Sequence, residues 1–90
     1  MSSDDDNSMA TNKDVANEII KLLQQSELSK KTKNKIINEI RQRLDVGSVI
    51  VTDVLSQLKA LQVVSFEVVG RAEVYSVNQK NLPRIEEIKN

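Results

Sequence analysis

Lysine and arginine side chains are concentrated in one short stretch of the chain. Six basic residues lie between positions 30 and 43, against the single acid Glu39, and they are Lys30, Lys31, Lys33, Lys35, Arg41 and Arg43. The stretch therefore carries a charge of +5 in a chain whose net charge is zero. Cations gathered in this way are suited to displacing counterions from a polyanion. A lysine run on a helix often only keeps one face in solvent, so the surrounding elements decide between the two interpretations.

Small polar side chains follow this stretch at helical spacing. Val51, Leu55 and Leu58 recur at i, i+4 and i+7, which places them on one buried stripe of a helix. The opposite face then carries Ser48, Val49, Thr52, Asp53 and Ser56, with Gln57 beside them. The polar side chains of this face either bind a ligand or simply form the solvent-exposed side of an amphipathic helix. One further cation, Arg71, follows Gly70 at a predicted hairpin turn, where a guanidinium has no role in a core.

Composition excludes most kinds of reactive site. The chain has no cysteine and no histidine, which excludes a thiolate or imidazole metal site, a disulfide and catalysis by either residue. Glu86 and Glu87 are adjacent rather than face to face, and two glycines do not make a phosphate-binding loop. We therefore expect no enzyme, no cofactor and no metal. No apolar run has the length of a signal or membrane-spanning segment, so we expect a cytoplasmic protein with no membrane partner.

Charge and length divide the chain into a tail and one domain. Residues 1–12 include Asp4, Asp5 and Asp6 and are predicted to be a disordered acidic tail. Without those three acids the chain has thirteen basic against ten acidic residues, a balance of +3. Residues 13–90 are expected to form a single domain, whose small size allows only a modest core and favours a dimer.

The periodicity of apolar residues predicts an α+β, mostly α fold with three helices, a two-stranded β-hairpin and a short C-terminal helix. Thr11 and Asp14 have capping-box spacing ahead of the first helix, and Ser29 is the expected cap of the second. The expected buried positions of these helices are Val15, Ala16, Ile19, Ile20, Leu22 and Leu23, then Ile36, Ile37, Ile40 and Leu44. After the third helix, Val64, Phe66 and Val68 alternate, Gly70 turns the chain, and Val74, Tyr75 and Val77 return. The final helix is expected near Asn81, with Leu82, Ile85 and Ile88 at every third residue.

This arrangement resembles the winged helix-turn-helix family of DNA-binding proteins, in particular small regulators of the ArsR and MarR type. The resemblance covers residues 36–78. The apolar register of the family falls on Leu44, Val46, Val51, Leu55 and Leu58, and its wing motif falls on Gly70, Arg71, Tyr75 and Val77. The chain departs from the family at Arg41 and Gln62, where Ala and Gly are frequent. It also has no Arg or His on the face of the third helix that reads DNA.

The resemblance implies a homodimeric transcriptional repressor that binds double-stranded DNA and occludes its operator. The third helix would lie in the major groove, and its candidate contacts are Ser48, Val49, Thr52, Asp53, Ser56 and Gln57. Val49 would meet a thymine methyl group, unless it packs against the preceding loop. Lys30, Lys31, Lys33 and Lys35 would contact phosphates, and Arg71 would enter a minor groove or clamp a phosphate. The first helix and residues 82–88 are the candidate dimer contacts.

Two alternatives stay open. The chain is also similar to winged-helix centromere-binding adaptors of plasmid and phage partition systems, whose wing resembles Val69-Gly70-Arg71. Such an adaptor would coat repeated sites and bind a partition motor protein. A winged-helix module that binds only protein is the third interpretation, because the net charge of the chain is modest.

Overall fold

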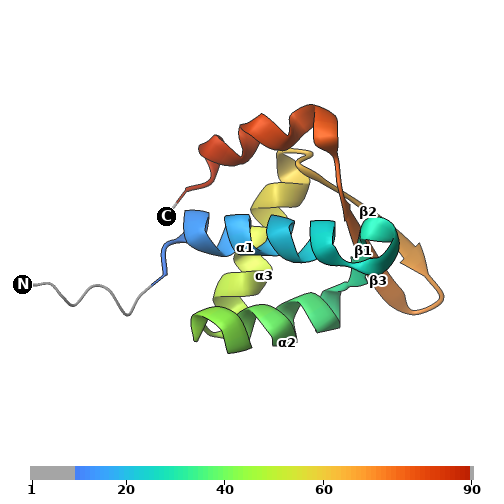
Figure 1. Ribbon diagram of the computed structural model, residues 1–90, viewed down its shortest axis with the longest axis horizontal. Coiled ribbons are helices and arrows are strands. Elements are labelled where there is room, and N and C mark those ends of the chain that lie inside the picture. The colour runs from blue at the N-terminus through green and yellow to red at the C-terminus, as the bar shows by residue number, and fades with distance from the viewer. Residues whose placement is uncertain (1–9, 90) are drawn as a thin grey trace, which may run out of the picture.

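The computed structural model describes residues 10–89 and has an α+β architecture in which three α-helices pack against a small antiparallel sheet (Figure 1). With η for a 3-10 helix, the elements are α1 (Asn12–Gln25), η2 (Glu27–Ser29), β1 (Lys30–Thr32), α2 (Lys33–Leu44), α3 (Ser48–Ala60), β2 (Val64–Val69), β3 (Ala72–Val77) and η3 (Gln79–Glu87). The mostly helical α+β class is thereby confirmed. The three acids of the predicted tail lie outside the described residues. The folded part already includes Ala10, which is half-buried against the core, and α1 begins at Asn12.

Helix α1 begins and packs as its sequence predicts. The hydroxyl of Thr11 accepts a hydrogen bond from the backbone N–H of Asp14 at 3.1 Å, and the Asp14 carboxylate accepts one from the Thr11 N–H at 3.0 Å. This reciprocal pair is the predicted capping box, which satisfies two N–H groups that the first turn of a helix cannot satisfy itself. All six side chains predicted to be buried on this helix are buried. The helix therefore presents one apolar stripe to the core.

Helix α2 begins at Lys33, later than predicted, and it is preceded by β1, a strand that was not predicted. Ser29 has a φ of 55°, in the left-handed region, whereas a residue that caps a helix N-terminus is extended. The cap is Thr32 instead, whose hydroxyl accepts from the N–H of Lys35 at 3.4 Å. Lys30 and Lys31 consequently lie in β1 and not on a helix, so their predicted position is wrong.

The sheet has three strands in the order β1-β3-β2, so the prediction of a two-stranded hairpin is incomplete. Strand β1 pairs antiparallel with β3, with Lys31 opposite Tyr75, while β2 and β3 form the predicted hairpin with Phe66 opposite Tyr75. Gly70 turns the hairpin at a φ of 64°, a conformation that glycine adopts without strain. The turn places Arg71 at the tip of the hairpin.

A short connection joins α2 to α3. Asp45 ends α2 in the left-handed conformation (φ 53°, ψ 47°), Val46 is half-buried against the core, and Gly47 caps α3 without a side chain. The predicted stripe of Val51, Leu55 and Leu58 is buried. Val54 is buried as well, which the predicted stripe did not include. The opposite face of α3 is therefore free to face solvent or a ligand.

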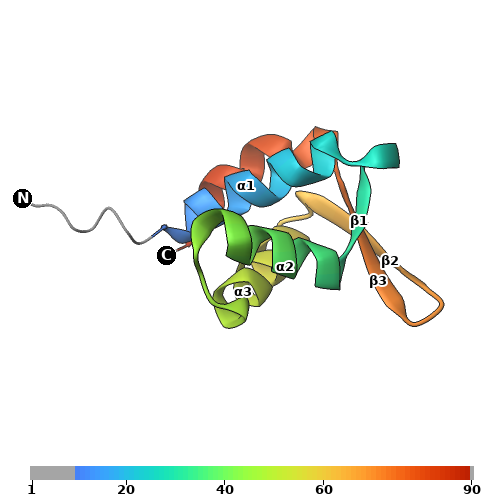
Figure 2. The same ribbon diagram turned by 60° about the horizontal axis from the view of Figure 1, so that its bottom comes forward.

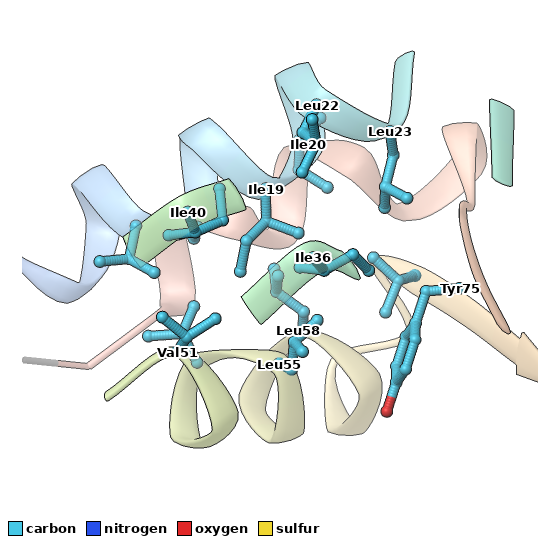
Figure 3. Close-up of a cluster of buried hydrophobic side chains, with 14 of the residues drawn as sticks. Ile19, Ile20, Leu22, Leu23, Ile36, Ile40, Val51, Leu55, Leu58 and Tyr75 are labelled. Carbon is cyan, nitrogen blue, oxygen red and sulfur yellow. The ribbon is translucent and has the colours of Figure 1, made fainter. Parts of the chain in front are cut away.

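The core lies where the three helices meet one end of the sheet. Figure 3 shows side chains of α1, α2 and α3 pointing toward one another, with Tyr75 of β3 at one edge. On α2, Ile36 and Ile40 are buried, whereas Ile37 and Leu44, also predicted to face the core, are only half-buried.

The C-terminal helix exists, but it is a 3-10 helix that covers Gln79–Glu87 and packs beside α1. Because a 3-10 helix has three residues per turn, the predicted spacing of Leu82, Ile85 and Ile88 keeps all three on one side. Leu82 and Ile85 are half-buried against the core and Ile88 is buried.

Candidate nucleic-acid interface

The residues predicted to contact DNA lie on β1, on the first turn of α2, on α3 and at the tip of the β2–β3 hairpin. Figure 2 shows α2 and α3 together on one side of the molecule, with the hairpin extending beyond them. The surface formed by the N-terminal turn of α2, the outward face of α3 and the hairpin is called the α3 surface below. Its cations, its polar groups and its exposed apolar groups decide what it can bind.

The basic cluster divides into cations held in ion pairs and cations that are not. Lys30 lies 3.4 Å from Glu67, Lys31 lies 2.9 Å from Glu39, and Arg43 lies 3.1 Å from Glu18. Lys33, Lys35 and Arg41 form no ion pair with another described residue, and neither does Arg71. A cation without a carboxylate partner can bind phosphate without first losing one. Lys33 and Lys35 are therefore better candidates for phosphate contact than Lys30 and Lys31.

Arg71 lies beside the N-terminus of α2, although thirty-eight positions separate it from Lys33 in the sequence. The two cations line a hollow of about 250 Å³ together with Thr32, Asn34, Ala72 and Glu73. A water molecule takes about 30 Å³ in the liquid, so the hollow has room for a solvated phosphate group. The N-terminus of α2 adds the positive end of a helix dipole to the two cations. The only carboxylate among the lining residues is that of Glu73, which already accepts a hydrogen bond from the Tyr75 hydroxyl at 3.0 Å.

The outward face of α3 is formed by small side chains and one exposed valine. Val49 is 80% exposed, which rules out its packing against the preceding loop, and Ser48, Asp53, Ser56 and Ala60 are also exposed. Thr52 is half-buried at the side of the face. Such short side chains allow another molecule to approach the helix backbone closely.

Gln57 binds the backbone of the C-terminal segment, a role that its sequence position did not indicate. Its side-chain carbonyl accepts from the backbone N–H of Lys89 at 2.8 Å, and its amide donates to the Lys89 carbonyl at 3.2 Å. The same amide also donates to the Asp53 carboxylate at 3.1 Å. Gln57 therefore faces the C-terminal segment, and the Asp53 carboxylate leans toward Gln57. Of the six candidate contacts on α3, Ser48, Val49, Thr52 and Ser56 remain free of such bonds.

Lys59 is a cation of the α3 surface that the sequence did not single out. Its ammonium nitrogen lies 3.7 Å from the centroid of the Phe66 ring on β2. A cation over an aromatic face is attracted by the ring quadrupole, so this contact joins α3 to the hairpin. Phe66 in turn packs on Tyr75, with the ring centroids 5.7 Å apart. Burial, the hydrogen bond to Glu73 and the charge of Glu73 raise the pKa of Tyr75 to about 12.

The face predicted to form a dimer is largely used within one chain. The apolar residues of α1 are buried, and Leu82, Ile85 and Ile88 pack against the same core. Lys13 and Glu86 form an ion pair across the junction at 3.1 Å. This face consequently offers mainly polar side chains to a second copy.

Among residues 10–89 no three His, Cys, Asp or Glu side chains are gathered so that they would hold a metal ion. Within the same residues, none of the helices is both long enough and apolar enough to cross a membrane. Comparison with known proteins finds no matching family model, no similar curated protein and no similar solved structure.

Proposed function

We propose that this protein binds double-stranded DNA as a winged helix-turn-helix protein, with α3 in the major groove and the β2–β3 hairpin as the wing. The observation that carries this proposal is the hollow in which Lys33 and Arg71, two unpaired cations from distant segments, lie at the N-terminus of α2. In helix-turn-helix docking, the helix before the recognition helix meets the phosphate backbone. A phosphate bound in this hollow would therefore lie at the N-terminus of α2, the helix that precedes the proposed recognition helix.

The start of α3 supports the same orientation. Gly47 caps this helix and has no side chain, so no capping side chain accepts from the first N–H groups of α3. The N-terminus of a helix leaves such groups for water or a ligand and carries a partial positive charge. The small side chains of the outward face allow this end of α3 to come close to a groove edge.

Net charge does not oppose this function, because DNA meets only one side of the protein. The acids near the proposed contacts all have partners within the chain. Glu39 pairs with Lys31 and Glu67 pairs with Lys30, whereas Glu73 accepts from the Tyr75 hydroxyl and Asp53 accepts from the Gln57 amide. Binding by phosphate contact depends on local cations and not on the balance of the whole chain.

The test is a salt titration of the affinity for a labelled duplex, with two variants of equal charge. Each phosphate contact contributes about 0.9 to the slope of log K against log salt, so Lys33→Ala with Arg71→Ala should lower the slope by roughly 1.8. The control replaces Lys21 and Lys80, exposed lysines on α1 and η3, with alanine. The control should keep the wild-type slope. The same loss in both variants, or no duplex binding at low salt, would contradict the proposal.

Repression of one operator and coating of centromere repeats are two uses of the same interface. They differ in how many sites the protein occupies on its natural DNA. Selection of bound fragments from genomic DNA gives the motif and its repeat count together. One isolated site, or a pair related by two-fold symmetry, favours a repressor, and a tandem array favours a partition adaptor.

A further inference from the structure

The recognition face of α3 lacks the side chains that identify guanine or adenine. Helix α3 contains no Arg, Asn or His, and its one lysine, Lys59, lies over the ring of Phe66. Gln57, its one amide side chain, is bound to the backbone of Lys89. Bidentate contacts to the edges of guanine and adenine are made by Arg, Lys, Asn and Gln. In this protein none of these is free on the outward face of α3.

An exposed valine occupies the position where a recognition helix meets the bases. Val49 lies in the first turn of α3 and is 80% exposed, and the N-terminal residues of a recognition helix contact base edges. Valine is branched at Cβ and holds one preferred rotamer in a helix, so its methyl groups project in a fixed direction. The apolar group that the major groove displays is the C5-methyl of thymine.

The surroundings of Val49 favour DNA over a protein partner. Its exposed neighbours on the outward face, Ser48, Asp53 and Ser56, are small or polar. Large contiguous exposed apolar patches mark protein-interaction sites, and the neighbours of Val49 on the outward face do not form one. The other exposed large apolar side chains are Leu28 in η2, Phe66, Val68 and Val69 in the hairpin, and Ile50, the next residue of α3, which is 38% exposed. Val49 thus has one partly exposed apolar neighbour on α3 and lies at the end of that helix that is remote from β2.

We propose that Val49 reads the methyl group of a thymine, so that this protein selects A·T base pairs at the position facing the first turn of α3. The inference rests on the proposed DNA binding. Discrimination comes from an apolar contact, while Lys33 and Arg71 supply affinity that does not depend on sequence. Selection from random duplexes should therefore yield a thymine at one fixed position of the selected motif.

Replacing that thymine with uracil, by placing deoxyuridine in the duplex, tests the contact because the exchange removes only the C5-methyl group. Burial of one methyl-sized group contributes about 0.8 kcal/mol, so the wild-type protein should bind the uracil duplex roughly fourfold more weakly. Val49→Ala should bind the two duplexes equally, with the affinity that the wild type has for uracil. Leu28→Ala, at an exposed apolar side chain of η2 outside the α3 surface, is the control and should keep the fourfold difference.

The outcomes separate this inference from the function on which it rests. Duplex binding without a thymine–uracil difference, or a Val49→Ala protein that keeps the difference, overturns the role of Val49 and leaves DNA binding intact. A selected motif with G·C at the facing position does the same. Absence of binding to any duplex overturns both. A wild-type protein that sediments as a dimer, with a Val49→Ala protein that sediments as a monomer, assigns Val49 to a second copy of the chain and also overturns the inference. Because Val49 is exposed, its alanine variant should keep the wild-type melting temperature, which confirms that folding is unchanged.

Discussion

The side-chain amide of Gln57 hydrogen-bonds both the N–H and the carbonyl of Lys89, at 2.8 Å and 3.2 Å. The amide thus offers the Lys89 backbone a donor and an acceptor, as a paired strand would. It holds the backbone in place directly after Ile88, whose side chain is buried. Asn12, at the start of α1, donates to the same Lys89 carbonyl at 2.7 Å. Gln57 therefore ties the C-terminal segment to α3 at the point where that segment also meets α1.

We expect Gln57→Ala to destabilise the protein without changing its DNA preference. The substitution removes two hydrogen bonds to the backbone of Lys89, and bonds of this kind contribute about 0.5–1.5 kcal/mol each. Urea unfolding should show a loss of about 1–3 kcal/mol, and the N–H of Lys89 should exchange faster with solvent. Ser56→Ala, at an exposed neighbour, is the control and should stay within about 0.5 kcal/mol of wild type. An altered base preference with unchanged stability would instead return Gln57 to the DNA interface.

Stability should fall steeply between pH 10 and pH 12 because of Tyr75. Its pKa is about 12 in the folded protein against 10.0 for the free side chain. The folded state thus keeps a proton that the unfolded state loses, so the stabilisation is complete below pH 10 and is lost as pH rises through this window. The slope approaches about 1.4 kcal/mol per pH unit.

The chain has one tyrosine and no tryptophan, so the ultraviolet absorbance of tyrosinate reports the pKa of Tyr75 alone. Tyr75→Phe keeps the ring against Phe66 and should remove this part of the slope. A tyrosine that titrates near 10 in the folded protein would contradict the burial and the Glu73 contact described here.

The helices were predictable because the spacing of their apolar residues directly indicates which side chains are buried in the core. The six buried side chains of α1 and the Val51, Leu55 and Leu58 stripe of α3 needed only the spacing of Val, Ile and Leu. Strand β1 was not predictable in this way. Its three residues, Lys30–Thr32, carry no alternating pattern, and the strand exists because β3 offers it a free edge.

The residue types of the candidate site were predictable from the sequence, but the contacts between those residues were not. The sequence shows that Lys31 and Lys33 are both basic, but only the fold places Glu39 beside Lys31 and Arg71 beside Lys33. The same limit hid the role of Gln57, because its partner is the backbone of Lys89, which leaves no trace in residue type. The contact of Lys59 with Phe66 likewise joins two elements that no local pattern connects.

The ion pair between Lys31 and Glu39 should support folding and not DNA binding. The Lys31 side chain is only 20% exposed, and its nitrogen lies 2.9 Å from the Glu39 carboxylate, which joins β1 to α2. A double-mutant cycle with Lys31→Ala and Glu39→Gln should give a coupling energy of about 0.5–1 kcal/mol. The more exposed pair of Lys13 and Glu86 should give a coupling close to zero in the same measurement. A smaller salt slope for Lys31→Ala than for wild type would place Lys31 on the DNA after all.

Gln62→Gly should stabilise the protein, because Gln62 occupies a backbone conformation that favours glycine. Its φ is 61°, and its N–H donates to the Lys59 carbonyl at 3.0 Å while the next N–H, of Val63, donates to the Leu58 carbonyl at 2.9 Å. These two bonds are the Schellman motif, in which a left-handed residue ends a helix. A residue with a Cβ loses about 1–2 kcal/mol of stability in this left-handed conformation, and glycine avoids that loss. Glycine also makes the unfolded chain more flexible, which lowers stability by roughly 0.5–1 kcal/mol and offsets part of the gain.

The free energy of unfolding should therefore rise by about 0.5–1 kcal/mol, measured by urea unfolding against Gln62→Ala, which keeps the Cβ and should match wild type. The two hydrogen bonds that Asn78 and Asn81 donate to Gln62 end on its backbone carbonyl, so glycine retains them. A destabilised glycine variant would mean that the Gln62 side chain itself holds the end of α3. In that case the alanine variant should be destabilised as well, which separates loss of the side chain from added freedom of the backbone.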